Sequence, residues 1–282
     1  MKNVLITGGV GFIGSNLAKE LLKRNYNVTS IDNYSFGSKK NEIDGVNYIN
    51  KDINNISDLK LKFDTCFHLA ALARVQLSFN SPSEYFNSNV SGTERVIQWA
   101  KENNVKVVYA GSSSRHFEPA DSPYAMYKFL GEEICKLYKK SFDLNVEIAR
   151  FYNVYGPGEV VDEVNGNVIG IWRSKVIQKK PLTIVGDGNQ RRDFTHVYDI
   201  VDGLIKIADT NHKHSDAWEL GTGNNHSVNE LYDMFKKRFK VTSELISDQP
   251  GNYKKTIRKN DDMLSKLNWK PIDRLNDHIN NL

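Results

Sequence analysis

The glycine-rich segment Thr7–Gly14 (TGGVGFIG) constrains the fold more than any other feature of this 282-residue chain. It follows residues 2–7, an apolar run typical of a buried strand. It leads directly into residues 12–25, where apolar side chains recur at helical spacing. A strand, a glycine turn and a helix in this order form the context of a dinucleotide-binding turn.

Three glycines of this turn each have a physical task. Gly8 allows the tight turn, Gly11 lets a pyrophosphate approach the backbone, and Gly14 lets the helix pack closely on the strand. Asp32 ends the next predicted strand, where a carboxylate accepts hydrogen bonds from ribose hydroxyls and repels a 2′-phosphate. The pattern therefore favours NAD over NADP. Asp52, at the end of the third strand, is either an acceptor for the adenine amine or an ordinary surface carboxylate.

Apolar runs alternate with amphipathic stretches through the first two-thirds of the chain. Such alternation predicts an α/β fold with a doubly wound parallel sheet, of the Rossmann type, covered by helices on both faces. The predicted strands are 2–7, 27–32, 47–53, 65–70, 106–110, 145–151 and 182–185. The predicted helices are 12–25, 82–103, 124–140, 168–178, 197–210 and 228–239.

The pattern loosens after residue 153, where glycines gather and the elements shorten. We expect residues 1–153 to form the nucleotide-binding domain, with a return segment at 193–217. Residues 154–192 and 218–282 are then expected to form a smaller C-terminal, substrate-binding lobe.

Composition excludes several classes of protein. No run of 18 apolar residues is present, so a transmembrane helix is not expected. The net charge of +4 is spread along the chain, which argues against a nucleic-acid-binding surface. The two cysteines, Cys66 and Cys135, build no disulfide framework and match no zinc spacing. We therefore expect a cytoplasmic protein without a metal site.

Tyr124 and Lys128 lie four residues apart and so share one face of a predicted helix. A neighbouring ammonium favours the phenolate form of a tyrosine, which turns that tyrosine into a candidate general base. Tyr127 is adjacent to the lysine and lies on another face, so Tyr124 is preferred. Ser112 directly follows the strand at 106–110, at the edge where a doubly wound sheet binds its ligands. The alternative for these residues is an ordinary partly buried tyrosine, a surface lysine and a polar loop.

Taken together and in order, the motifs resemble the extended short-chain dehydrogenase/reductase family, specifically its nucleotide-sugar epimerases and dehydratases. The resemblance runs from residue 1 to about 271. It is carried by TGGVGFIGSNL at 7–17, HLAALA at 68–73, NVSGT at 89–93, SPYAMYK at 122–128, ARFYNVYGP at 149–157, GDGNQRRDFTHVYD at 186–199, LGTGNNHSV at 220–228 and LNWKP at 267–271.

The resemblance implies roles for individual residues. Tyr124 is the expected base, Lys128 its partner and ribose anchor, and Ser112 the proton relay. Asn153 and Arg192 are expected at the sugar-nucleotide diphosphate, with Ser113, Val168 and Arg258 as further substrate contacts. The expected NAD contacts are Gly8, Gly11, Phe12, Ile13, Gly14, Asp32, Asn33, Asp52, Ile53, Leu69, Ala70, Ala71, Tyr124 and Lys128.

Three departures from the family pattern shape the functional expectation. The serine run continues as Arg115-His116-Phe117, and the segment before Tyr124 is shorter than usual. The common Arg-Pro-Gly-Asp sequence is replaced by residues 249–252 (QPGN), so Lys254, Lys255 or Arg258 must replace its arginine, and Arg258 is preferred. Serines at 113 and 114 occupy the positions of the acid–base pair of 4,6-dehydratases, which argues against dehydration.

The expected function is therefore NAD-dependent epimerisation of a UDP-sugar, or another nucleotide-diphosphate sugar, at C4 through a 4-keto intermediate. The segment VIGIW at 168–172 resembles that of epimerases acting on N-acetylhexosamine sugars. The alternatives are a UDP-glucuronate decarboxylase, an epimerase acting at C5 or C6, and a catalytically silent NAD-binding scaffold. The resemblance also implies a homodimer.

Overall fold

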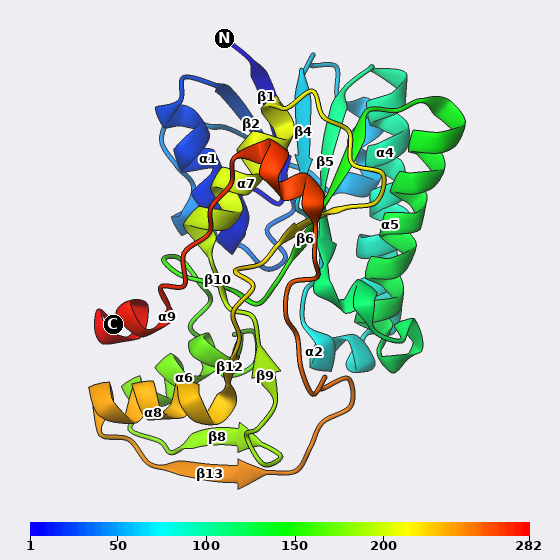
Figure 1. Ribbon diagram of the computed structural model, residues 1–282. Coiled ribbons are helices and arrows are strands. Elements are labelled where there is room, and N and C mark those ends of the chain that lie inside the picture. The colour runs from blue at the N-terminus through cyan, green and yellow to red at the C-terminus, as the bar shows by residue number, and fades with distance from the viewer.

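The computed structural model describes all residues, 1–282, and contains a seven-stranded, wholly parallel sheet (Figure 1). The strand order is β11-β6-β5-β4-β1-β2-β3. The strands are β1 (Asn3–Thr7), β2 (Asn27–Asp32), β3 (Asn47–Asn50), β4 (Thr65–His68), β5 (Lys106–Ser112), β6 (Val146–Phe151) and β11 (Trp218–Leu220). The order turns back between β1 and β4, which makes that edge of the sheet the expected ligand crevice. The doubly wound α/β fold is thus confirmed.

Helices cover both faces of this sheet, and most residues of its central strands are buried, including the charged residues Glu147 and Arg150 on β6. On one face α1 (Phe12–Lys23) and α7 (Val197–Asp209) share a hydrophobic core with the strands. On the other face α4 (Gly92–Glu102) and α5 (Pro123–Phe142) enclose a second core. The predicted helix at 82–103 is interrupted, since a π-turn at Asn87–Ser91 joins α3 (Pro82–Phe86) to α4.

The start of α5 is fixed by local chemistry. The Ser122 side chain accepts a hydrogen bond from the backbone N–H of Ala125 at 3.1 Å, and Pro123 occupies the first helical turn. A serine cap followed by proline is a strong start signal for a helix. This cap places Tyr124 in the first turn, beside the carboxyl end of β5.

A smaller lobe lies below the sheet in Figure 1. Its helices are α6 (Val168–Ile177), α8 (Val228–Phe239) and α9 (Leu275–Asn280), and its strands β8 (Leu182–Val185) and β13 (Ser243–Ile246) pair in parallel. Trp172 and Phe235 stack edge to face at 5.3 Å in a third hydrophobic core. Short pieces complete the fold: α2 (Val75–Asn80), β7 (Val154–Tyr155) paired with β10 (Thr195–His196), and β9 (Arg191–Arg192) paired with β12 (His226–Ser227).

The expected division of the chain needs one correction. Residues 218–282 do not all belong to the smaller lobe, because β11 pairs with β6 and completes the central sheet. Leu264, Leu267 and Trp269 also pack into the core between the sheet and α7. Three residues of sequence, WEL, are too short a run to indicate a strand. No helix is both long and apolar enough to cross a membrane.

Candidate active site

A cavity of about 1010 Å³ opens at the carboxyl ends of the strands. It extends from the glycine turn to residues of the smaller lobe. Residues that are predicted to bind the nucleotide and residues that are predicted to bind the substrate therefore line one cavity. The predicted site residues that line it are Gly8, Gly11, Phe12, Ile13, Gly14, Leu69, Ala71, Ser112, Ser113, Tyr124, Lys128, Asn153 and Arg192.

The glycine turn fits a pyrophosphate. A Cβ at Gly14 would lie 2.1 Å from the carbonyl oxygen of Gly8, and Gly8 itself has φ +78°. At Gly11 a Cβ would approach only that same carbonyl, at 3.2 Å, so this residue leaves room above the turn. Gly11 also begins α1 without a side-chain cap, which leaves N–H groups of the first turn available to an anion. The residues present therefore fit the phosphates of a dinucleotide.

Asp32 lies just outside the cavity lining and is held by the turn. Its carboxylate accepts hydrogen bonds from the backbone N–H of Val10 at 3.1 Å and of Tyr34 at 2.9 Å. Burial raises the pKa of Asp32, while these two hydrogen bonds act in the opposite direction. A carboxylate has about four lone-pair directions, so acceptor capacity remains for two ribose hydroxyls.

Four predicted nucleotide contacts have mainly structural partners. Asp52 caps a short helix by accepting from Asn54 N at 2.9 Å, and Asn33 Nδ2 donates to the same carboxylate at 2.8 Å. Ile53 is buried under α4, and Ala70 N donates to Thr7 Oγ1 at 3.2 Å. None of the four lines the cavity. A contact of any of them with the adenine side of a nucleotide stays a prediction.

Ser112 and Tyr124 meet at the centre of the cavity. Ser112 ends β5, and its Oγ accepts from the Tyr124 hydroxyl at 3.3 Å. The same Oγ accepts hydrogen bonds from the N–H of Ser114 at 3.2 Å and from its hydroxyl at 2.9 Å. A chain of hydroxyls therefore connects Tyr124 to the loop that follows β5, and it can carry a proton.

The sequence predicts that the Lys128 ammonium lowers the pKa of Tyr124, but in the structure other groups act on this phenol. Burial raises the pKa of its phenol, against the lowering effect of the Ser112 hydrogen bond and of the positive charge of Arg74. Lys128 directs its ammonium to the carbonyl oxygen of Ala110 and lies 4.5 Å from the centre of the Tyr109 ring. Burial lowers the pKa of Lys128 to about 8. The lysine thus lines the cavity without contacting the phenol.

The choice between the two neighbouring tyrosines has a geometric answer. Tyr127 packs its ring edge to face against Phe86, with the ring centres 5.6 Å apart, and does not line the cavity. Tyr124 lines the cavity and is linked to Ser112. The helix-face argument for Tyr124 over Tyr127 agrees with this placement.

Arg192 brings an uncompensated positive charge into the cavity. Its guanidinium donates to the carbonyl oxygen of Tyr253 at 2.6 Å and to Asn252 Oδ1 at 2.6 Å, and it forms no ion pair with a carboxylate. Burial lowers its pKa to about 10. Asn153 lines the same end of the cavity, where its Nδ2 donates to Thr256 Oγ1 at 3.1 Å. A buried guanidinium without a carboxylate partner suits a phosphate group.

Two predicted substrate contacts lie elsewhere. The Arg258 guanidinium donates to the carbonyl oxygen of Gly221 at 2.9 Å and lines no part of the cavity, so it does not replace the missing family arginine. Its backbone N–H bonds to Asp193, and this turns the side chain toward the 221–223 loop. Val168 begins α6 and packs against the core of the lobe, while its neighbour Asn167 lines the cavity instead.

Sequence reasoning missed Arg74, which lines the cavity close to Tyr124. Its Nε donates to the carbonyl oxygen of Asn165, and burial lowers its pKa. Arg74 directly follows the HLAALA motif, and this position is the only feature of the sequence that could have indicated a place in the site. The nucleotide side also includes residues 35–37, in a loop, and Asn41, at the end of a short 3-10 helix; neither segment carries a recognisable pattern.

Ion pairs of the buried Arg150 lie close to Ser112. Arg150, on β6, bonds to Glu132 at 2.8 Å, to Glu219 at 2.8 Å and to Asp216 at 2.8 Å. Because Glu132 belongs to α5 and Glu219 to β11, the guanidinium joins three elements beneath the cavity. The Ser112 N–H also contacts Glu132, at 3.4 Å.

Comparison with known proteins agrees with this geometry. Residues 4–221 match the NAD dependent epimerase/dehydratase family. A putative UDP-glucose 4-epimerase of Methanocaldococcus jannaschii is 32% identical over 88% of this chain and 86% of its own length. A UDP-N-acetyl-alpha-D-glucosaminuronate decarboxylase of Bacillus cytotoxicus is 32% identical over 82% of this chain and 78% of its own.

Solved structures share the whole architecture. The UDP-glucuronic acid 4-epimerase of Bacillus cereus, solved with UDP-glucuronic acid and NAD, superimposes with a TM-score of 0.90 at 27% identity, covering 98% of this chain and 96% of that one. The match includes both the sheet and the smaller lobe, since nearly all of each chain is covered. The chain therefore belongs to the NAD dependent epimerase/dehydratase family.

Proposed function

We propose that this protein epimerises a UDP-sugar at C4, with NAD as a bound cofactor. The observation that carries the proposal is the Tyr124–Ser112 pair, 3.3 Å apart, in one cavity between a pyrophosphate-shaped turn and the uncompensated guanidinium of Arg192. That arrangement places a proton acceptor between two phosphate-binding ends. A nucleotide sugar and a dinucleotide, each anchored by its phosphates, then meet at the tyrosine.

The residues divide the chemistry among them. Tyr124 takes the proton of the sugar's 4-hydroxyl, directly or through Ser112 Oγ, and returns it after the hydrogen at C4 has changed face. Lys128, buried on the same helix, supplies a positive charge and an N–H donor to the cofactor side of the cavity. When bound, NAD would supply the hydride acceptor and donor for C4.

Epimerisation at C4 needs the sugar to present both faces to the same site. Arg192 and Asn153 hold the diphosphate at the lobe end, and the sugar turns about this anchor while the 4-keto group is present. The cavity of about 1010 Å³ leaves space for such a rotation. A cofactor held here would be regenerated in every turnover, because the hydride taken from C4 would return to C4, and NAD would not need to leave.

We further propose that the sheet domain holds NAD and that the lobe, with the sheet edge, holds the UDP-sugar. A homodimer in a reducing cytoplasm completes the proposal. Cys66 and Cys135 are both free and buried, which fits such a compartment. The dimer rests on the family resemblance, and light scattering coupled to gel filtration tests it.

Decarboxylation of a UDP-uronate is the second candidate, because relatives of both activities match this chain at the same identity. The two reactions share the 4-oxidation and diverge afterwards, at C5. Incubation with a panel of UDP-sugars, followed by NMR of the products, separates them. A 4-epimer supports the proposal. A pentose product with release of CO₂ supports the alternative, and the absence of any product supports a silent scaffold.

A further inference from the structure

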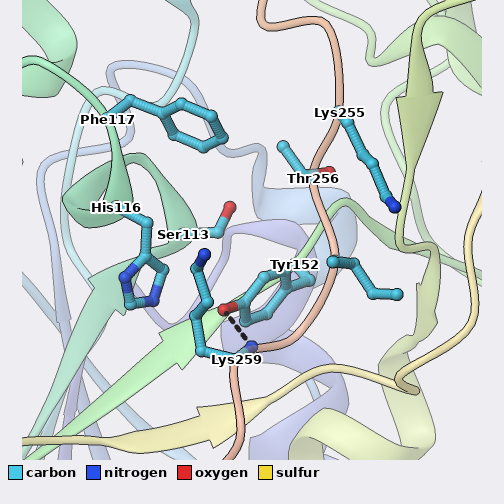
Figure 2. Close-up of a pocket in the computed structure, with 8 residues that line it drawn as sticks. Ser113, His116, Phe117, Tyr152, Lys255, Thr256 and Lys259 are labelled. Carbon is cyan, nitrogen blue, oxygen red and sulfur yellow. Dashed lines mark hydrogen bonds between the residues drawn. The ribbon is translucent and has the colours of Figure 1, made fainter.

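A second, smaller cavity adjoins the active site. It has a volume of about 250 Å³ and shares Ser113 and Thr256 with the main cavity. Figure 2 shows its lining, with Phe117 and His116 on one side and Lys255 and Thr256 on the other. Ser113 is the residue after Ser112, so this space begins one residue from the proposed proton relay.

Two lysines contribute positive charge to the lining of this cavity. Lys255 and Lys259 line it, and neither ammonium forms an ion pair with a carboxylate. Glu219 is the acid beside it, and it already accepts hydrogen bonds from His116 at 3.0 Å, Tyr152 at 2.6 Å and Arg150 at 2.8 Å. The charge of Glu219 is paired with that of Arg150, and Glu219 forms no ion pair with either lysine. The exposed ammonium groups of Lys255 and Lys259 therefore have no carboxylate partner.

Lys259 is held in position by its main chain. Its backbone N–H donates to the hydroxyl of Tyr152 at 3.3 Å, drawn as a dashed line in Figure 2. From there its side chain extends toward Ser113, whereas the side chain of Lys255 points in another direction. Of the two lysines, Lys259 therefore faces the passage to the active site more directly.

The passage itself is lined by small hydroxyl side chains. Thr256 is buried, and its Oγ1 accepts from Asn153 Nδ2 at 3.1 Å, so it adjoins the proposed diphosphate anchor. Ser113 Oγ has no hydrogen-bond partner among the protein side chains. A sugar held between Asn153 and Tyr124 can therefore direct a ring substituent past Ser113 and Thr256 toward Lys259.

We propose that this second cavity binds a carboxylate carried by the sugar of the nucleotide-sugar substrate. The inference rests on the proposed function and adds the chemical class of the sugar: an acidic sugar rather than a neutral hexose. A neutral hydroxyl can only accept a hydrogen bond from the Lys259 ammonium, whereas a carboxylate also pairs its charge with Lys259 and accepts a hydrogen bond from Ser113. The carboxylate is either C6 of a hexuronate or part of an acidic ether on the ring.

Isothermal titration calorimetry with two matched pairs of ligands tests this. UDP-glucuronate and UDP-glucose differ at C6, and UDP-N-acetylmuramate and UDP-N-acetylglucosamine differ by a lactyl carboxylate. In at least one pair the acidic ligand is expected to bind about two- to fivefold more tightly, the effect of an exposed ion pair. The pair that shows the preference identifies the source of the carboxylate.

Lys259→Gln is expected to remove this preference and to leave the affinity for the neutral ligand within about twofold. Lys255→Gln is expected to reduce it less, and the matched control Lys254→Gln, at an exposed neighbour outside both cavities, to leave it intact. Equal affinities within both pairs, or a preference that persists in Lys259→Gln, overturn the inference and leave the proposed function standing. Failure of every UDP-sugar to bind overturns both.

Discussion

Replacing Tyr124 with phenylalanine removes the proposed proton acceptor and little else. The variant keeps the ring and loses one hydroxyl, whose hydrogen bond to Ser112 is long at 3.3 Å. We therefore expect the free energy of unfolding to change by less than about 1 kcal/mol. General-base catalysis is worth about 10²–10⁴-fold, or roughly 3–5 kcal/mol of the barrier, and kcat should fall by that factor.

The assay separates these two effects. Turnover of the UDP-sugar that the wild type epimerises is followed by NMR, binding by calorimetry and stability by urea denaturation. Tyr127→Phe is the control, because Tyr127 packs on Phe86 outside the cavity. Its kcat should stay within about twofold of the wild type. Normal turnover in Tyr124→Phe together with an inactive Tyr127→Phe would refute the assignment.

The pH profile carries the same reasoning further. A tyrosine acts as a base only when it is deprotonated, so activity should rise with pH through the pKa of Tyr124 in the complex. The positive charge of Arg74 lowers that pKa. Arg74→Met should therefore shift the rising limb to higher pH, which initial rates between pH 6 and about 10 would measure. An unshifted limb shows that Arg74 does not act on the phenol.

Three other changes test separate parts of the site. Asp32→Ala should weaken binding of NAD more than of NADP, because the carboxylate repels a 2′-phosphate; fluorescence titration with both nucleotides checks this, and an equal loss for both contradicts it. Arg192→Gln should raise the dissociation constant for UDP about 10- to 100-fold, since it removes a charge-assisted hydrogen bond worth about 1.5–3 kcal/mol, and calorimetry with UDP alone measures it. Gly14→Ala would bring a Cβ to 2.1 Å from the Gly8 carbonyl oxygen, so it should lower the free energy of unfolding by about 1–3 kcal/mol and abolish NAD retention; a stable variant that still copurifies with NAD contradicts the packing argument.

The sheet and the nucleotide turn could be predicted because their signals are local. β2 and β8 begin and end where the sequence pattern places them, and α8 does so too. Each of these elements is bounded by turn residues or capped by a serine. Each is also long enough for its apolar residues to show the spacing of a strand or a helix. β11 has three residues, and only its pairing with β6 makes it a strand.

The site was harder to predict where it depends on long-range placement. Gly8, Ser112 and Tyr124 belong to motifs and line the cavity as expected. The sequence favours Arg258 as the replacement arginine, but Asp193 fixes the backbone of this residue, whose side chain donates to the carbonyl oxygen of Gly221. Arg74 belongs to no motif, and only the folded chain brings it to Tyr124.

The central claim is that hydride leaves C4 and returns to C4 of the same sugar. Incubation of the purified protein with a UDP-sugar deuterated at C4 tests it most directly, with NMR and mass spectrometry of the products. The account predicts a mixture of the two C4 epimers that keeps the deuterium at C4. A product that has lost this deuterium to the medium, or that is formed with loss of CO₂ instead of inversion at C4, would contradict it.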